Sequence, residues 1–176
     1  MSVVIDGSAG MTTAIGAVYN GIQSATAQAS TSGTSIDFTS IPSWVKRVTV
    51  MFNGVSTNGT SDFLIQIGAG SVTTTGYNAL RAYTQTSSAI TNTTSTAGIG
   101  LFAGGGATSN YYGSFTITTL GSNIWVLSGI IGTPTNTVMD YSTGGITLGG
   151  TLDRVRITTA NGTDTFDAGS INILYE

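Results

Sequence analysis

The chain has 176 residues, no histidine, no cysteine, and 5 basic against 8 acidic side chains, for a net charge of −3. This composition excludes a histidine proton shuttle, a cysteine nucleophile and zinc sites built from either residue, and it lacks the clustered basic surface that nucleic-acid binding needs. Because 40% of the residues are hydrophobic, a core can form without disulfides or metals. We therefore expect a scaffold or binding protein that is not an enzyme and has no catalytic, cofactor or metal site.

We expect neither a signal peptide nor a membrane span. The opening MSVVIDGSAGMTT has no positive charge and reaches Asp6 after three apolar residues, which is unlike a secretory signal. No stretch approaches the ~20 apolar residues that a membrane-spanning helix requires. The low charge density gives a free monomer little protection against association. We infer that subunits of the same or another protein cover much of the surface.

Residues 1–33 differ in composition from the rest of the chain. Four apolar residues there follow a heptad rhythm: Met11, Ile15, Val18 and Ile22. This rhythm predicts a short helix that associates with copies of itself, although Gly16 and Gly21 each cost such a helix about 1 kcal/mol. The alternative is a lone amphipathic or extended segment lying on the body. We divide the chain into residues 1–33, which attach and oligomerise, and a domain at residues 34–176.

From Ser35 onward the apolar residues alternate with a period of two, which indicates half-buried strands. The alternation is clearest at 44–52, 62–67, 111–120, 152–159 and 170–175. The residues expected to face inward are Val48, Val50, Phe52, Phe63, Ile65, Ile67, Tyr111, Phe115, Ile117, Val155, Ile157, Ile171, Ile173 and Tyr175.

Short Gly- and Asn-containing segments separate these strands and predict turns. They lie at 54–59, 68–71, 121–123, 143–145 and 160–162. Some ten short strands without a fixed repeat period argue against a solenoid. We predict an all-β fold, an antiparallel β-sandwich of jelly-roll type with a short N-terminal extension, for which a helix is one option.

Residues 84–110 carry no charge and are the hardest part to interpret. We expect strands around 89–91 and 99–102 and a mobile loop at 103–109. Segments of this kind commonly form the exposed tips of a sandwich, where binding residues lie.

Carboxylates are the remaining candidates for chemistry. Asp164 and Asp167, with Asp153 brought close by strand pairing, could serve a glycosidase or a calcium ion. Their spacing matches no specific pattern, so we favour an Asx-type turn that flanks Phe166 as a core anchor.

Basic residues and aromatic residues suggest two further kinds of site. Arg154 and Arg156 share a strand face and could clamp an anion, but we favour pairing with aspartate, and we expect Asp37 and Asp62 to pair with an arginine or with backbone donors. Five aromatic residues could stack on a sugar, although alternation would bury about half of them: Tyr77, Tyr83, Tyr111, Tyr112 and Trp125. Our candidate receptor contacts are Arg81, Tyr83, Tyr111 and Tyr112.

Two long blocks of the sequence resemble a known module. Residues 29–68, with IPSWVKR and VSTNG, and residues 152–176, with NGTDTFDAGSINI, are similar to a segment that recurs in tail-fibre and other virion proteins of tailed bacteriophages. The resemblance is strong at both ends and loose between about 70 and 150. It implies a β-sandwich, usually the distal head of a trimeric fibre, whose variable middle faces the host surface. It supplies no catalytic residues.

The resemblance therefore predicts a structural protein of a virion surface, assembled in the host cytoplasm. The first candidate is a homotrimeric tail-fibre or fibre-tip protein that binds other virion proteins and a host-surface glycan or protein. Because only about 33 residues precede the module, the second candidate is a capsid decoration (cement) protein. A third class comprises a carbohydrate-active enzyme using Asp164 and Asp167, or a bacterial adhesin.

Overall fold

The computed structural model describes residues 4–6, 10–12, 18–19, 21–85, 88–101 and 107–176. Within these ranges the regular secondary structure consists of β-strands alone, and all strand pairings are antiparallel. The prediction of an all-β chain is confirmed. Among the described residues there is also no helix of the length and hydrophobicity needed to cross a membrane.

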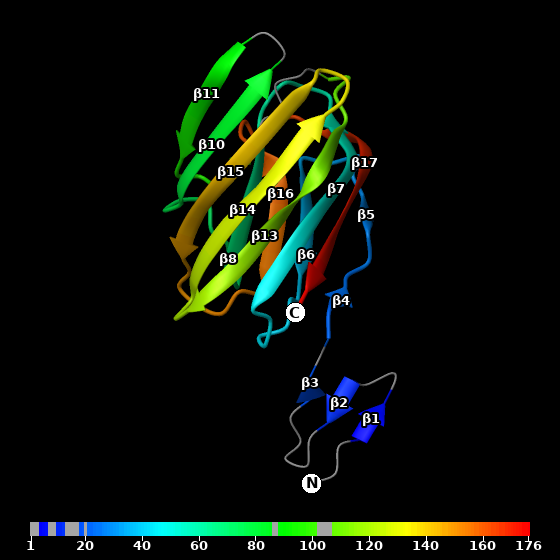
Figure 1. Cartoon of the computed structure of the whole chain (residues 1–176), viewed down its shortest axis with the longest axis vertical. Helices are drawn as coiled ribbons and strands as arrows, with labels where there is room; N and C mark the ends of the chain where they lie inside the picture. The colour runs from blue at the N-terminus through cyan, green and yellow to red at the C-terminus, as the bar shows by residue number, and fades with distance from the viewer. Residues whose placement is uncertain (1–3, 7–9, 13–17, 20, 86–87, 102–106) are drawn as a thin grey trace.

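The strands form one large, one medium and one small sheet (Figure 1). The large sheet contains β4 (Gln23–Ser24), β5 (Gln28–Ala29), β7 (Arg47–Thr57), β10 (Asn78–Gln85), β11 (Ser88–Ser95), β13 (Tyr111–Gly121), β14 (Ile124–Thr133), β15 (Val138–Thr147) and β17 (Phe166–Tyr175). The medium sheet contains β6 (Ser35–Thr39), β8 (Phe63–Ala69), β9 (Ser71–Val72), β12 (Ile99–Leu101) and β16 (Arg154–Thr159). The small one contains β1 (Val4–Asp6), β2 (Gly10–Thr12) and β3 (Val18–Tyr19).

The order of the strands confirms the jelly-roll sandwich. One sheet holds β5, β17, β7 and β13 in that spatial order, and the other holds β6, β16, β8 and β12. The chain passes between the two sheets as a jelly roll requires. Two hairpins are added to it: β10–β11 follows β8, and β14–β15 follows β13. Both hairpins extend the large sheet on the side of β13, in the order β13, β14, β15, β10 and β11.

The core fills the space between the two sheets. The predicted inward residues are buried, apart from Tyr175, which is half-buried. Phe63 stacks on Phe166 at 5.9 Å between ring centroids and meets Tyr111 edge-on at 5.4 Å, geometries that aromatic rings favour. Leu64 and Gln66 are buried as well, because the segment before β12 covers β8: Gln66 Nε2 donates to the Ala97 carbonyl oxygen at 2.8 Å.

Three of the five predicted turns join strands, one overlaps the bend after β7 at residues 58–59, and one lies inside a strand. The segments at 68–71, 121–123 and 160–162 contain or flank turns. The segment at 54–59 begins inside β7, where Gly54 has a φ of 65° and accommodates a shift in the pairing with β13. The segment at 143–145 lies wholly inside β15, and a Cβ on Gly144 would lie 2.7 Å from the Asn78 carbonyl oxygen. Glycine serves close backbone packing at Gly144, and the turn prediction there is wrong.

The prediction of a helix near the N-terminus is also wrong for the described residues, which form strands instead. Residues 23–30 run along β17, with Ala25 N donating to Ile173 O and Ser30 N to Gly169 O, both at 3.0 Å. The physical reason is that β17 offers an open edge of backbone donors and acceptors. A segment interrupted by glycine gains more from pairing with that edge than from an isolated helix.

Residues 23–30 therefore belong to the large sheet, although they fall within the predicted attachment segment 1–33. Of the four predicted oligomerisation residues, Ile22 is 63% exposed. Ile15 lies outside the described residues, and Met11 and Val18 are described only as parts of β2 and β3. The role of residues 1–33 in attachment stays a prediction.

Candidate functional site

The four predicted receptor contacts occupy different environments. Tyr112 is 46% exposed, whereas Tyr111 is only 2% exposed. Tyr111 must therefore be corrected from a surface contact to a core residue: it faces inward with Phe115 and Ile117, as the alternation of β13 requires. Arg81 is 9% exposed and also faces inward, so it does not offer its charge to the surface.

Arg81 belongs to a group of charged and polar side chains enclosed by β10, β12 and β15. Its Nη1 lies 2.6 Å from Asp62 Oδ1, and its guanidinium carbon lies 5.7 Å from the centre of the Tyr83 ring. Asp140 is 1% exposed and is 2.7 Å from the Ser142 hydroxyl, which also lies 2.6 Å from the Gly100 carbonyl oxygen. Buried charges require partners of this kind. The arrangement explains why Arg81 and Asp140 can face inward.

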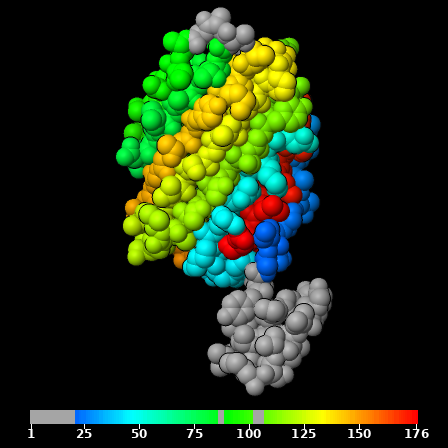
Figure 2. Space-filling model, in the orientation of Figure 1, coloured from blue at the N-terminus to red at the C-terminus, as the bar shows by residue number. Residues whose placement is uncertain are grey.

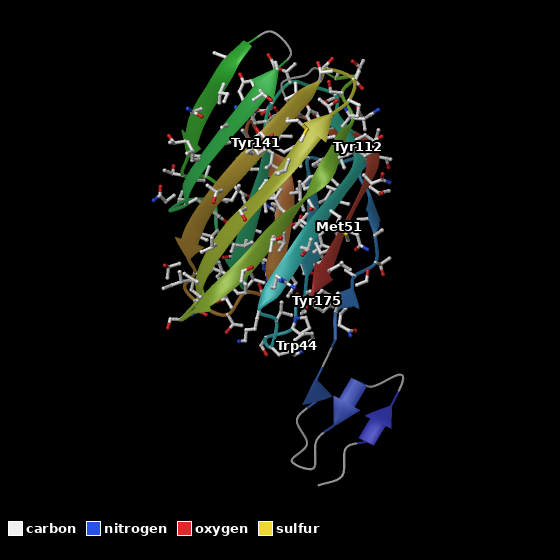
Figure 3. The ribbon with its side chains drawn as sticks, in the orientation of Figure 1. Trp44, Met51, Tyr112, Tyr141 and Tyr175 are labelled. Atoms are coloured by element: carbon white, nitrogen blue, oxygen red, sulfur yellow. The ribbon has the colours of Figure 1, made fainter. Side chains whose placement is uncertain are left out.

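The opposite side of the same strands is apolar and exposed. We define the uncharged face as the outward side of β10, β13, β14 and β15. It carries seven large hydrophobic side chains that are 39–47% exposed: Leu80, Tyr112, Ile124, Val126, Ile130, Met139 and Tyr141. None of the described residues that alternate outward on these four strands is charged. Figures 2 and 3 view this side of the molecule, where the strands form one broad surface bearing Tyr112 and Tyr141.

The uncharged face also contains depressions. Two shallow depressions of about 500 and 490 Å³ adjoin at Ile130. The first lies between Tyr112, Gly132 and Met139, and the second between Leu80, Ile130 and Tyr141. Strand register fixes these neighbours, since Ile130 pairs with Tyr141 and Gly132 with Met139. A Cβ on Gly132 would lie 2.6 Å from the Met139 sulfur, so the glycine keeps the first depression open.

A second candidate surface is the end of the sandwich away from the C-terminus. Figure 1 shows the turn between β14 and β15 and the start of β13 at this end. Asn136 Nδ2 donates to Ser109 Oγ and joins the two segments. The strands expected around 89–91 and 99–102 are present as β11 and β12. Most of the predicted mobile loop at 103–109 lies outside the described residues. We call residues 107–110 and 134–137 the tip.

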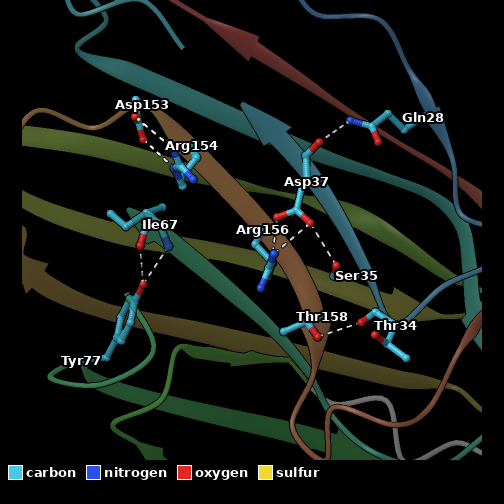
Figure 4. A network of polar contacts seen from close by, with 10 residues as sticks. All are labelled: Gln28, Thr34, Ser35, Asp37, Ile67, Tyr77, Asp153, Arg154, Arg156 and Thr158. Atoms are coloured by element: carbon cyan, nitrogen blue, oxygen red, sulfur yellow. Dashed lines mark hydrogen bonds and ion pairs between the residues drawn. The ribbon is translucent and has the colours of Figure 1, made fainter. Parts of the chain in front are cut away.

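The arginines of the medium sheet pair with aspartates, as predicted. Arg156 donates to both oxygens of Asp37 at 2.7 and 3.1 Å, and Arg154 does the same to Asp153 at 2.8 and 3.2 Å (Figure 4). The bond from Arg154 holds the pKa of Asp153 below its usual range. Bidentate pairs of this kind satisfy the guanidinium donors internally. They leave little basis for an anion clamp at Arg154 and Arg156.

Asp164 stabilises a loop that contains an Asx-type turn, but the side chain that makes the turn is that of Asn161 and not, as predicted, that of Asp164 or Asp167. Its carboxylate accepts from Ser61 N at 2.9 Å and from Asn161 Nδ2 at 2.6 Å, and Asn161 Oδ1 accepts from Thr163 N at 3.0 Å. The bond from Asn161, then that from Ser61, lowers the pKa of Asp164, whereas a glycosidase acid needs a raised pKa. Phe166 beside it is 1% exposed and anchors the core.

The other carboxylates do not converge on Asp164. Asp167 accepts from Ser56 Oγ, and Asp153 lies beside β16 at the end opposite to Asn161. Among the described residues, no group of three histidine, cysteine, aspartate or glutamate side chains is placed to hold a metal ion.

Besides Tyr111, two more of the five predicted sugar-stacking residues are core residues. Trp125 is 4% and Tyr77 2% exposed. The Tyr77 hydroxyl accepts from Ile67 N at 2.7 Å and lies 3.1 Å from the Thr73 carbonyl oxygen, so it fastens the hairpin between β8 and β9. Burial raises the pKa of Tyr77 to about 12.

Comparisons with known proteins assign no family. No protein-family model matches the chain, and neither does any curated protein. A solved structure of a protein of unknown function from Shewanella oneidensis MR-1 aligns with a TM-score of 0.26 and 10% sequence identity, over 99% of this chain and 73% of the other. A similarity at this level carries no argument about function.

Proposed function

We propose that the chain is a structural component of the virion surface of a tailed bacteriophage. The first candidate role is that of a homotrimeric tail-fibre or fibre-tip protein whose tip contacts the host surface. It binds other virion proteins and a host glycan or protein, and it performs no catalysis. The protein is assembled in the host cytoplasm together with the particle.

One observation carries this proposal: the two blocks that resemble the phage module lie side by side in the fold. Residues 29–68 supply β6, β7 and β8, and residues 152–176 supply β16 and β17. These strands pair with one another, β17 with β7 and β16 with both β6 and β8. Segments more than 80 residues apart in sequence therefore form one unit at the centre of the sandwich. The weakly resembling middle supplies the added hairpins and the tip, which suits a constant scaffold with a variable contact surface.

The position of the tip also suits host contact. Residues 23–30 lie along β17, whose last residues mark the end opposite the tip (Figure 1). A chain attached through its N-terminal segment would therefore present the tip outward. Thr135 at the turn between β14 and β15 is exposed, and exposed turns of a rigid sandwich are common binding sites.

Competition with phage adsorption tests this role. The purified protein should bind host cells and slow adsorption of the parent phage. Thr135→Lys at the tip should weaken this competition. The matched variant Thr39→Lys, at the exposed last residue of β6, should compete like the wild type. Absence of competition by the wild-type protein would sink the fibre role.

The second candidate is a capsid decoration protein that braces the head shell. The uncharged face favours this candidate too, because bracing depends on burying broad apolar and backbone-rich surfaces between neighbouring subunits. A decoration protein is present in hundreds of copies per particle and a fibre in few. Quantitative gel staining of purified virions separates the two roles, and antibody labelling of the particle locates the protein on head or tail.

A further inference from the structure

We propose that the uncharged face of β10, β13, β14 and β15 is the surface through which copies of this chain associate. The inference rests on the self-association in the proposed function but does not depend on whether the protein lies on the tail or the head. It transfers the main subunit contact from the N-terminal segment, where the heptad rhythm suggested it, to the added hairpins of the large sheet.

The first argument is that β10 and β15 have their polarity reversed. A sheet with one face in water normally turns its apolar residues inward and its charges outward. In these strands Arg81 and Asp140 are 9% and 1% exposed, whereas Leu80 and Tyr141 are 46% and 47% exposed. A face built in this way is favoured when it is covered by protein, since contiguous exposed apolar patches mark interaction sites.

The second argument is the size of the surface. Four strands about 4.8 Å apart and about ten residues long at ~3.3 Å per residue cover roughly 600 Å². The neighbouring β7 turns Met51 to the same side, but it also turns the exposed Arg47 there, so its area is not counted in the uncharged face. Stable interfaces bury about 600–1,000 Å² on each partner, so the surface has the area that a stable self-association needs.

The third argument is that the face can complement itself. It offers projecting rings at Tyr112 and Tyr141 beside two depressions of about 500 and 490 Å³. A neighbouring copy supplies the ring that enters a depression, and a head-to-tail contact of this kind can close into a ring of three copies. Each copy carries a net charge of −3, and like copies repel least where they meet through a surface without charge.

The edge of the large sheet supports the same placement. The described side chains of β11 from Ala89 to Thr94 are exposed, Ile90 to 64%. This edge strand, SAITNTTS, has no charge, no proline and no lysine, although edges open to solvent usually carry such protection against pairing. An associated copy on the uncharged face would lie beside this edge and shield it.

Light scattering on the purified full-length chain tests the proposal. The wild type should have a mass of at least twice the 17.9 kDa of one chain. Ile130→Asp and Tyr141→Asp, each placing an acid at the centre of the face, should raise the dissociation constant by roughly 100-fold or more, because an unpaired charge would be buried. Thermal melts followed by circular dichroism should show that both variants remain folded.

Two matched variants locate the contact. Thr39→Asp adds the same charge on the medium sheet and should leave the mass unchanged. Ile22→Asp adds it to the predicted heptad segment and should have a much smaller effect than Ile130→Asp. Dissociation by Ile22→Asp, with Ile130→Asp still oligomeric, would place the contact in the N-terminal segment and overturn the proposal.

Thiol labelling gives a second measurement that does not depend on destabilising the assembly. Since the chain contains no cysteine, a maleimide can react only at an introduced one. Ser128→Cys on the face should be labelled at least 10-fold more slowly than Thr39→Cys. Equal labelling rates of the two cysteines in an oligomeric protein would overturn the assignment of the subunit contact to the uncharged face, but not self-association itself. A monomeric wild type would overturn self-association in both proposals.

Discussion

The two outward faces of the sandwich expose opposite kinds of side chains. The medium sheet presents the ion pairs Asp37–Arg156 and Asp153–Arg154 to solvent. On β10, β14 and β15 the large sheet presents Leu80, Ile130 and Tyr141. The charges of these strands, Arg81 and Asp140, face inward. Both faces belong to strands with the same alternation. Alternation therefore defines the two faces of a strand. Which residues lie on the outward face depends on whether water or protein covers that face.

Removing one arginine from each sheet should give the largest contrast. Arg81→Met removes a guanidinium that is 10% exposed and leaves Asp62, whose side chain is 31% exposed, without its ion-pair partner. This change should lower the free energy of unfolding by about 2 kcal/mol. Arg156→Met, in a pair whose side chains are 36% and 32% exposed, should cost about 0–1 kcal/mol. Urea unfolding of both variants measures the two values. Equal costs would contradict the claim that the inward side of β10 encloses the charge of Arg81.

Adding one acid to each face should give a smaller contrast. Val126→Asp lies toward the end of the uncharged face and should weaken self-association roughly 10-fold, equivalent to about 1.4 kcal/mol. Asp at Thr39 on the medium sheet should not change it. Sedimentation velocity over a concentration series measures both constants. A large effect of Thr39→Asp would show that the faces had been assigned to the wrong partners.

Acidification should act on the medium sheet and its flanking loops. The pKa values of Asp153 and Asp164 are lowered in the fold, so their contribution is present above the unfolded pKa of about 3.9 and is lost as the pH falls through the folded pKa. Without histidine, the melting temperature should stay flat between about pH 5.5 and 7. It should fall below about pH 4. A step near pH 6.5 would reveal a titrating group that this account lacks.

Salt should have the smallest effect on the association of the uncharged face. Because exposed charges are screened by salt and apolar contacts are not, the dissociation constant should change less than about twofold between 0.05 and 0.5 M sodium chloride. Sodium sulfate should tighten the association, since it favours apolar burial. Light scattering at each salt concentration checks this. A strong loss of association in sodium chloride would mean that ion pairs hold the copies together.

The sequence predicted the scaffold well because its strands are strongly patterned. Val48, Val50, Phe52, Ile171 and Ile173 alternate without exception, and all are buried. The prediction failed where tertiary contacts outweigh local pattern. Residues 23–30 pair with the open edge of β17, and Gly144 permits a close backbone contact instead of a turn.

The uncharged face could not be predicted from the sequence. In β15, VMDYSTGGIT, hydropathy favours turning Met139 and Tyr141 inward and Asp140 outward, and the fold does the reverse. This choice depends on the pairing with β10, which places Tyr83 opposite Asp140 and Arg81 opposite Ser142. Sequence patterning puts Ser142 on the same face of β15 as Asp140, but it does not supply this strand pairing. Tyr111 differs in this respect, because the alternation of β13 predicts that it faces inward, against its choice as a receptor contact.

The mass of the wild-type protein in solution shows whether copies of the chain associate. Sedimentation equilibrium of the full-length chain at micromolar concentration should give three times 17.9 kDa, as expected of a homotrimer whose copies meet through the uncharged face. A mass of 17.9 kDa at every concentration would contradict the account.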